Sequence, residues 1–161
     1  MLADVNCCFG SWPFARPRPR TAKAFEAHLA THGIDRALVT SLEAVLGPDP
    51  DLANHDLFAA FDGAGRVIPV PTIDPSMRHW EACLDTYRDG GHDGAVCIVP
   101  NYHRYSLDDD GVNRLASALT ARKSCLLLQV RIEHERGQYP LMKVPGVPVD
   151  DVAAFGARHP D

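Results

Sequence analysis

The stretch LLLQVRIE, residues 126–133, decides the fold class of this chain. It begins as an apolar run and then alternates, because Gln129, Arg131 and Glu133 take every second position and would share one face of a strand. Central strands of an open parallel sheet are apolar on both faces, whereas barrel strands become polar inside the mouth, where the functional site lies. The alternation therefore favours a barrel strand.

The first apolar stretch of the chain shows the same alternation of polar and apolar residues. In residues 2–9, Asp4, Asn6 and Cys8 occupy alternate positions, and we expect them on one face of a strand. A barrel accounts for a polar face on both strands, whereas an edge strand of an open sheet accounts only for the later one.

Apolar runs of strand length recur along the chain at residues 2–9, 37–41, 67–73, 95–99 and 125–132. Their starts lie roughly 30 residues apart, the length of one βαβ unit. Helical patterns with recognisable ends fill the intervals: an N-cap at Thr21 and a stop at Gly33, a face at 57–61, Asp74-Pro75, the capping box Ser106-x-x-Asp109, and a last helix at about 149–158. This alternation predicts an α/β protein with parallel strands and right-handed crossovers.

Two architectures fit five such units. A complete flavodoxin-like open sheet would just fill 161 residues, whereas a (β/α)8 barrel usually has about 250. Because strand texture favours the barrel, we expect residues 1–161 to form a single partial TIM-barrel domain with about five β/α units. The missing strands would leave sheet edges open, so we expect the natural chain to continue beyond Asp161. The alternative is a homo-oligomer closed through those edges.

Composition and charge restrict the class of protein. Hydrophobic residues make up 45% and charged residues 23% of the chain, ordinary values for a globular protein. The net charge of −5 argues against nucleic-acid and anionic-membrane partners, and no apolar run approaches the length of a membrane span. Since the N-terminus lacks signal-peptide features and four of the five cysteines lie in apolar segments, we expect a reducing, cytoplasmic compartment.

In either architecture, function lies at the carboxyl ends of the strands. After the first strand, Trp12 and Arg16 belong to a loop in which prolines separate three arginines, through Arg20. Their guanidinium groups suit a carboxylate or phosphate, so Trp12 and Arg16 are candidate substrate contacts. A solvated loop that covers the barrel end is the alternative.

A denser polar and aromatic group follows the fourth strand, in the sequence PNYHRY at residues 100–105. Small-molecule pockets are commonly lined by aromatic side chains and a few polar groups, so Asn101 and Tyr105 are candidate substrate contacts. His103 is a candidate general base or ligand. The alternative is a capped loop with its tyrosines packed beneath it.

After the fifth strand, Glu133 and Glu135 are candidate acid or base groups, and Arg131 is a candidate partner for either of them. Of these, Glu133 and Arg131 are the candidate catalytic residues. Salt bridges that merely hold the loop explain these charges equally well.

Several motifs resemble the amidohydrolase-2 branch of the metal-dependent hydrolase superfamily. Its opening strand typically reads Asp-x-His-x-His-x-Gly, often followed by Trp-Pro-Phe, and residues 4–14 read DVNCCFGSWPF. The resemblance continues at residues 33–37, 73–75 and 100–103. It spans about residues 3–136, and each motif is moderately specific.

The resemblance implies a (β/α)8 barrel in which a divalent metal such as zinc activates water for hydrolysis or assists a non-oxidative decarboxylation. The two histidines of the first motif fall on Asn6 and Cys8, of which only cysteine is a good zinc ligand. Gln129 and Arg131 stand where a fifth-strand histidine is expected, and the ligands after strands six and eight have no counterpart. We therefore expect metal binding at Asn6 and Cys8 to be weak or absent.

Two kinds of function follow. The first is an amidohydrolase-like hydrolase, or a related decarboxylase, that acts on a small carboxylate-bearing or cyclic substrate. The second is a non-catalytic protein, either a metal-free binder of anionic ligands or a structural barrel fragment. Nucleotide or flavin binding is not expected, because no glycine-rich phosphate loop follows the first strand.

Overall fold

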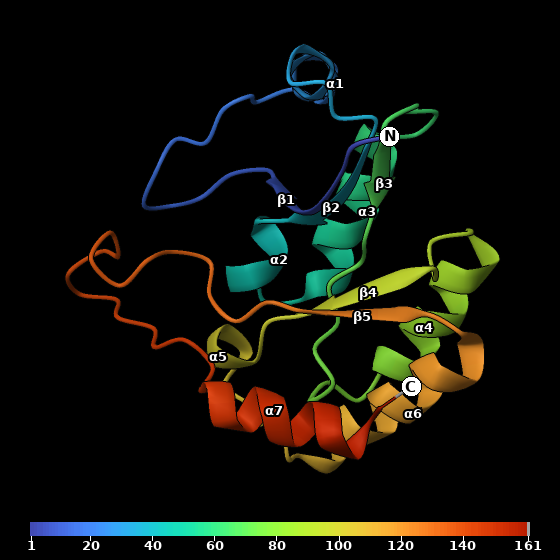
Figure 1. The fold of residues 1–161 in the computed structure, drawn as a ribbon, viewed down its shortest axis with the longest axis vertical. Helices are drawn as coiled ribbons and strands as arrows, with labels where there is room; N and C mark the ends of the chain where they lie inside the picture. The colour runs from blue at the N-terminus through green and yellow to red at the C-terminus, as the bar shows by residue number, and fades with distance from the viewer. Residues whose placement is uncertain (161) are drawn as a thin grey trace. The chain divides into compact units, whose positions relative to one another are not determined.

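The computed structural model describes residues 1–160. They form two compact units, Met1–Thr72 and the residues from Ile73 onward, and each is described by itself. The first unit contains β1 (Ala3–Phe9), α1 (Ala22–Thr31), β2 (Arg36–Ser41), α2 (Glu43–Leu46), α3 (Pro50–Ala60) and β3 (Val67–Pro69) (Figure 1). The second contains α4 (Trp80–Asp89), β4 (Ala95–Ile98), α5 (Pro100–His103), α6 (Asp110–Arg122), β5 (Cys125–Leu128) and α7 (Val149–Arg158). The mixed α/β class with parallel sheets is confirmed.

The sheet of the first unit is parallel and sequential. Its strand order is β1-β2-β3, with β2 hydrogen-bonded to both neighbours. A flavodoxin-like sheet would instead place its first strand between the second and the third. The observed order is therefore not that of the flavodoxin-like alternative.

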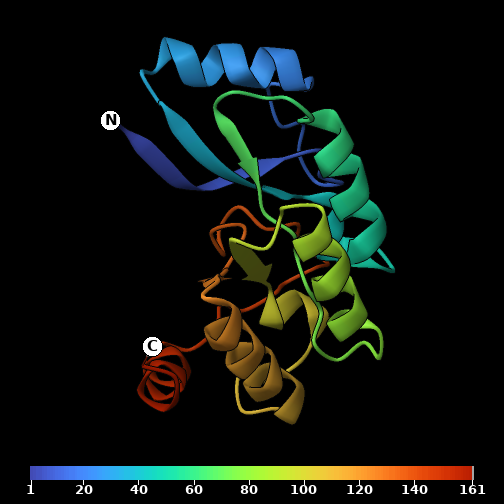
Figure 2. The ribbon, with the colours of Figure 1, turned by 90° about the vertical axis from the view of Figure 1, so that its right-hand side faces the viewer.

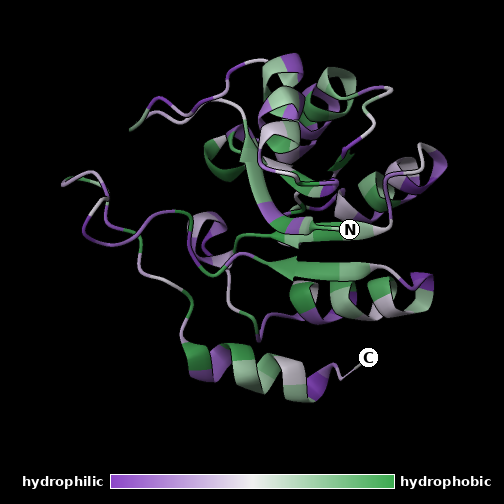
Figure 3. Cartoon of the chain, turned by 45° about the horizontal axis from the view of Figure 1, so that its top comes forward, coloured by the Kyte–Doolittle hydropathy of each residue, from purple (hydrophilic) through white to green (hydrophobic). Residues whose placement is uncertain are grey.

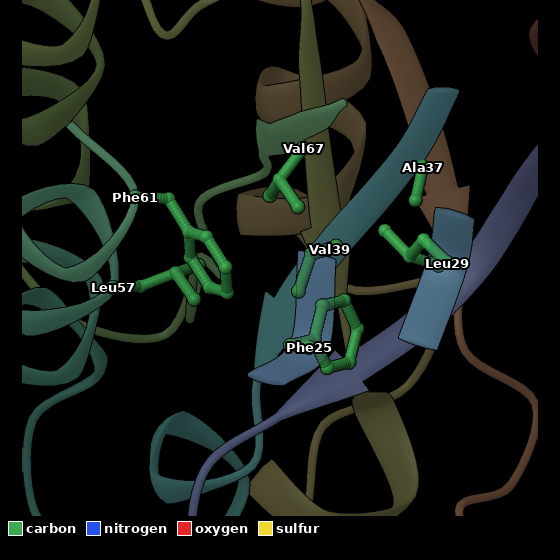
Figure 4. Close-up of a cluster of buried hydrophobic side chains, with 7 residues drawn as sticks. All are labelled: Phe25, Leu29, Ala37, Val39, Leu57, Phe61 and Val67. Carbon is green, nitrogen blue, oxygen red and sulfur yellow. The ribbon is translucent and has the colours of Figure 1, made fainter. Parts of the chain in front are cut away.

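Helices cover one face of this sheet. Ala37 and Val39, which alternate along β2, are fully buried against Phe25 of α1 and Leu57 of α3. Figure 4 shows these side chains converging with those of Leu29, Phe61 and Val67, and Figure 2 shows α1 and α3 beside the strands. On the opposite face, Ile68 of β3 is 42% exposed. Helices α1 and α3 thus cover one face of this sheet, and Ile68 lies partly exposed on the other.

The ends of α1 follow the sequence signals. The hydroxyl of Thr21 accepts a hydrogen bond from the backbone N–H of Ala24 at 3.2 Å and so caps a free donor. Gly33 follows the helix with a φ of +68°, a left-handed conformation that glycine adopts without steric cost. Both predicted termini are confirmed.

A break in register interrupts β1. Asp4 pairs with Ala37 of β2, and the next pair is Cys7 with Val39, so two residues of β1 oppose one of β2. Directly paired residues of parallel strands point to the same face, which puts Asp4 with Cys7 rather than with Cys8. The prediction that Asp4, Asn6 and Cys8 share one face is therefore wrong. The extra residue of a bulge shifts the alternation.

The second unit pairs β4 with β5 in parallel, from Ala95 with Cys125 to Ile98 with Leu128. Two ion pairs join α4 to α6: Arg114 with Glu81 at 3.1 Å and Arg122 with Asp85 at 2.7 Å. Helix α7 occupies the predicted residues, and hydrophobic and hydrophilic bands alternate along it in Figure 3.

Two predicted boundaries in this unit are wrong. The helix expected at Asp74-Pro75 begins at Trp80, because the carboxylate of Asp74 accepts hydrogen bonds from the N–H and hydroxyl of Ser76 and closes a turn. The fifth strand ends at Leu128 rather than Ile132, so the prediction that Gln129, Arg131 and Glu133 share one face of a strand is wrong. Its neighbour β4 stops where Pro100 opens α5, so the later residues have no strand beside them.

No helix within residues 1–160 is both long and apolar enough to cross a membrane.

Candidate functional site

The end of β4 brings a histidine and a carboxylate together in the second unit. The N–H of Ile73 donates to the carbonyl of Cys97 at 2.9 Å, which holds the following residue, Asp74, beside the end of this strand. Helix α5 then carries His103, whose Nδ1 lies 3.9 Å from Oδ2 of Asp74. Their side chains are only 6% and 10% exposed. A nearly buried imidazole next to a carboxylate can accept and release protons in a site of low polarity.

Tyr105 lies beside this pair. Its ring centroid is 6.2 Å from that of His103, and the left-handed conformation of Arg104 (φ 62°) turns the chain between them. Burial, and then the negative charge of Asp74, raise the pKa of the Tyr105 hydroxyl well above its ordinary value. Tyr105 therefore keeps its proton near neutral pH and can donate a hydrogen bond.

A second tyrosine connects this region to the segment after β5. Burial, and then the charge of Glu133, raise the pKa of Tyr102. The carboxylate of Glu133 is thus close enough to α5 to influence it, although Glu133 lies beyond the end of the strand that was expected to position it. Its side chain is partly buried.

Asn101 holds the long loop between β5 and α7. Its Nδ2 donates to the carbonyl oxygens of Val130 at 3.3 Å and Pro145 at 2.8 Å. Its Oδ1 is buried and has no hydrogen-bond partner within residues 1–160. The amide nitrogen is therefore occupied by the loop, and the buried amide oxygen is an acceptor without a partner among the described residues.

Arg131 is placed differently from its neighbours. It is exposed, and among the described residues it forms no ion pair with Glu133 or Glu135. The predicted pairing of Arg131 with either glutamate is not present.

The residues at the predicted metal positions lie in the first unit. Asn6 is exposed at the register break of β1. The Sγ of Cys8 lies 3.5 Å from the hydroxyl of Thr40, and burial raises the pKa of this thiol, which disfavours the thiolate that zinc requires.

Within residues 1–160, no group of three His, Cys, Asp or Glu side chains is arranged to hold a metal ion. One weak amide donor and one protonated thiol do not make the donor set of a zinc site. These residues therefore do not fit the metal that the sequence resemblance implies.

The other two predicted contacts line a cavity of about 670 Å³ in the first unit. Trp12 and Arg16 contribute to its wall together with Arg20 and Glu43. Oε1 of Glu43 accepts a hydrogen bond from the N–H of Ser11 at 2.5 Å. The cavity combines aromatic surface with charges of both signs.

Three residues of these regions were missed from sequence. Asp74 was interpreted as a helix cap, although its position directly after an apolar run could have marked it as a strand-end carboxylate. Tyr102 lies in the predicted cluster of residues 100–105, but the sequence alone assigns it no role. Glu43 closely follows the second apolar run and so places a carboxylate near another strand end.

Comparisons with protein families and with curated proteins give no match. One solved structure of similar fold is a probable 2-pyrone-4,6-dicarboxylic acid hydrolase from Acinetobacter baumannii, whose crystal structure holds citric acid. The chains are 13% identical, and the similarity covers 79% of this chain with a TM-score of 0.50. This chain spans about half the length of that hydrolase, 48%. At this identity, the likeness concerns the α/β fold.

Proposed function

We propose that this chain is a hydrolase-like protein that acts on a small carboxylate-bearing or cyclic substrate, with His103 as general base and acid. The observation that carries the proposal is the nearly buried pair of His103 and Asp74 at the carboxyl end of β4. Strand ends of this kind hold the functional residues of parallel α/β folds.

The fold supports a partial barrel. Sequential parallel strands with helices on one face are what a (β/α)8 barrel requires, and the first unit has both features. We infer that the chain supplies about five β/α units of such a barrel. The substrate class is supported by the similar solved hydrolase, which is named for a cyclic dicarboxylic acid and binds citric acid.

The chemistry assigned to the pair is ordinary ester or lactone hydrolysis. His103 takes a proton from water as the water oxygen attacks the carbonyl carbon, and then returns it to the leaving oxygen. Asp74, 3.9 Å from Nδ1, stabilises the imidazolium formed between the two steps. Tyr105 stays protonated and donates to developing negative charge. General acid–base catalysis of this kind contributes roughly 10²- to 10⁴-fold.

The remaining candidates have secondary roles. Glu133 shapes the charge beside Tyr102, and the buried Oδ1 of Asn101 is offered to a substrate donor. Arg131 is exposed and is proposed as a contact for the substrate carboxylate. No step is assigned to a divalent metal, because Asn6 and Cys8 do not form its donor set. A cytoplasmic location without nucleic-acid partners remains part of the proposal.

The test is hydrolysis of carboxylated lactones and pyrones, followed as acid release at constant pH. We expect turnover by the wild-type chain, its loss in His103→Asn, and unchanged turnover in His134→Asn, which alters an exposed histidine. Circular dichroism of each variant checks the fold. Failure to hydrolyse any compound, or full activity of folded His103→Asn, would overturn the proposal. Binding of the same compounds without turnover would instead support the non-catalytic alternative.

A further inference from the structure

The cavity in the first unit has the size and the lining residues of a small-molecule site. It has a volume of about 670 Å³, within the range of small-molecule sites. Phe9 and Trp12 give it aromatic surface, and Arg16, Arg20 and Glu43 give it charge. We propose that this cavity binds the carboxylate of a small ring-bearing acid through Arg16 and Arg20. Binding of such an acid here is independent of the proposed function, because every residue that it uses lies in the first unit.

Two of the three arginines in the proline-rich loop line this cavity. Arg16 and Arg20 line it, whereas Arg18, between two prolines, lines only a surface hollow beside α1, to which Arg20 also contributes. Among the described residues, neither Arg16 nor Arg20 has an ion-pair partner. Two guanidinium groups without internal partners beside one cavity favour an anionic ligand.

Glu43 determines which ligand charge the cavity favours. Its carboxylate is fixed by the N–H of Ser11 at 2.5 Å and the hydroxyl of Ser41 at 3.1 Å. Two arginines and one fixed glutamate leave the cavity with one net positive charge. That charge matches a monoanionic carboxylate better than a phosphate, which carries more negative charge beside the Glu43 oxygens.

The aromatic wall favours a ring next to that carboxylate. Trp12 is only 6% exposed, and the ring of Phe9 packs edge-on against Phe25 and Phe61, so both rings are held in place. A rigid apolar wall beside guanidinium groups recognises a flat ring with an attached carboxylate at little entropic cost.

Benzoate is the probe, and its neutral isostere benzamide and inorganic phosphate are the comparisons. In nitrogen-15 NMR spectra of the whole chain, we expect millimolar benzoate to shift the amides of Gly10 and Ser11 and the indole of Trp12. Benzamide should leave them in place, and phosphate should bind more weakly. Absence of these shifts with benzoate, equal shifts with benzamide, or tighter binding of phosphate would overturn the proposal.

Variants test the assignment of the charges. Arg16→Gln and Arg20→Gln should each weaken benzoate binding roughly tenfold or more, since each removes a charge-assisted contact. Arg18→Gln is the matched control in the same loop and should have little effect. Glu43→Gln keeps an acceptor for Ser11 and removes the negative charge, so it should strengthen binding. Equal weakening by all three arginine variants would indicate unspecific electrostatics and refute the site.

The outcome separates this inference from the proposed function. Benzoate binding that depends on Arg16 and Arg20, in a chain that hydrolyses nothing, would support the inference and refute the hydrolase. Hydrolysis that depends on His103, with benzoate binding indifferent to Arg16 and Arg20, would do the reverse.

Discussion

Oδ2 of Asp74 lies 3.9 Å from Nδ1 of His103, and the same carboxylate raises the pKa of Tyr105. One negative charge, nearly buried at the end of β4, therefore acts on both His103 and Tyr105. Replacing Asp74 by a neutral residue should therefore affect both side chains.

We first predict that Asp74→Asn lowers the pKa of the Tyr105 hydroxyl. The negative charge of Asp74 opposes ionisation of the phenol, so a neutral amide makes the phenolate easier to form. Burial, the larger cause, should still keep the pKa above its ordinary value. Tyrosinate absorbance during alkaline titration measures it, with Tyr105→Phe to identify the transition. Asp89→Asn, an exposed change, should leave that transition unmoved.

The second prediction concerns Asn54, a fully buried amide in α3. Its Nδ2 donates to the carbonyl of Thr72 at 2.8 Å, and its Oδ1 accepts from the N–H of Thr72 at 2.9 Å. Asn54→Ala leaves both backbone groups buried without their partner and should lower the free energy of unfolding by roughly 2 to 4 kcal/mol. Urea unfolding measures the change. Asp56→Ala, an exposed position of the same helix, should cost far less, and equal costs would refute this role.

Much of the fold could be predicted because its signals are local. Thr21 and Gly33 delimit α1, and α7 occupies the predicted residues 149–158, since caps and apolar spacing act within one helix. The fifth strand could not be bounded in this way. Past Gln129, the carbonyl of Val130 accepts the N–H of Val147, so a distant segment takes the hydrogen bonds that a longer strand would have used.

The candidate site, too, could be predicted only where its residues are close in sequence. The cluster around His103 and Tyr105 could be predicted, because its members are close in sequence. The contact of Asp74 with His103 could not, because it depends on the hydrogen bond that places Ile73 beside Cys97. The register break in β1 was likewise invisible, since alternation in sequence does not reveal an inserted residue.

The third prediction concerns the close approach of Gly10 and Glu43. Gly10 has a φ of +118°, and a Cβ built there would overlap the Glu43 carboxylate. Gly10→Ala should therefore be destabilising by about 1 to 3 kcal/mol for the backbone alone, with a further cost for displacing Glu43. In a double-mutant cycle, adding Glu43→Ala should recover that further cost, at least about 0.5 kcal/mol. Strict additivity of the two changes, measured by urea unfolding, would exclude the clash.

The last prediction is a loss of stability at alkaline pH that depends on Cys7. Burial, and then Asp4, raise the pKa of this thiol from 9.0 to about 12. Between these values the unfolded chain releases the proton and the folded chain keeps it, so the native state binds more protons there. The contribution of Cys7 to stability is thus fully present below pH 9.0 and is lost as the pH rises toward about 12.

Cys7→Ala should flatten this decline, although it also lowers stability at every pH by removing a side chain packed on the core. Cys125→Ala, at an exposed thiol, should leave the slope unchanged. Unfolding midpoints in urea, measured from neutral pH upward, give the slope for each variant. A decline that is as steep in Cys7→Ala as in the wild-type chain would show that the buried thiol near Asp4 is not its source.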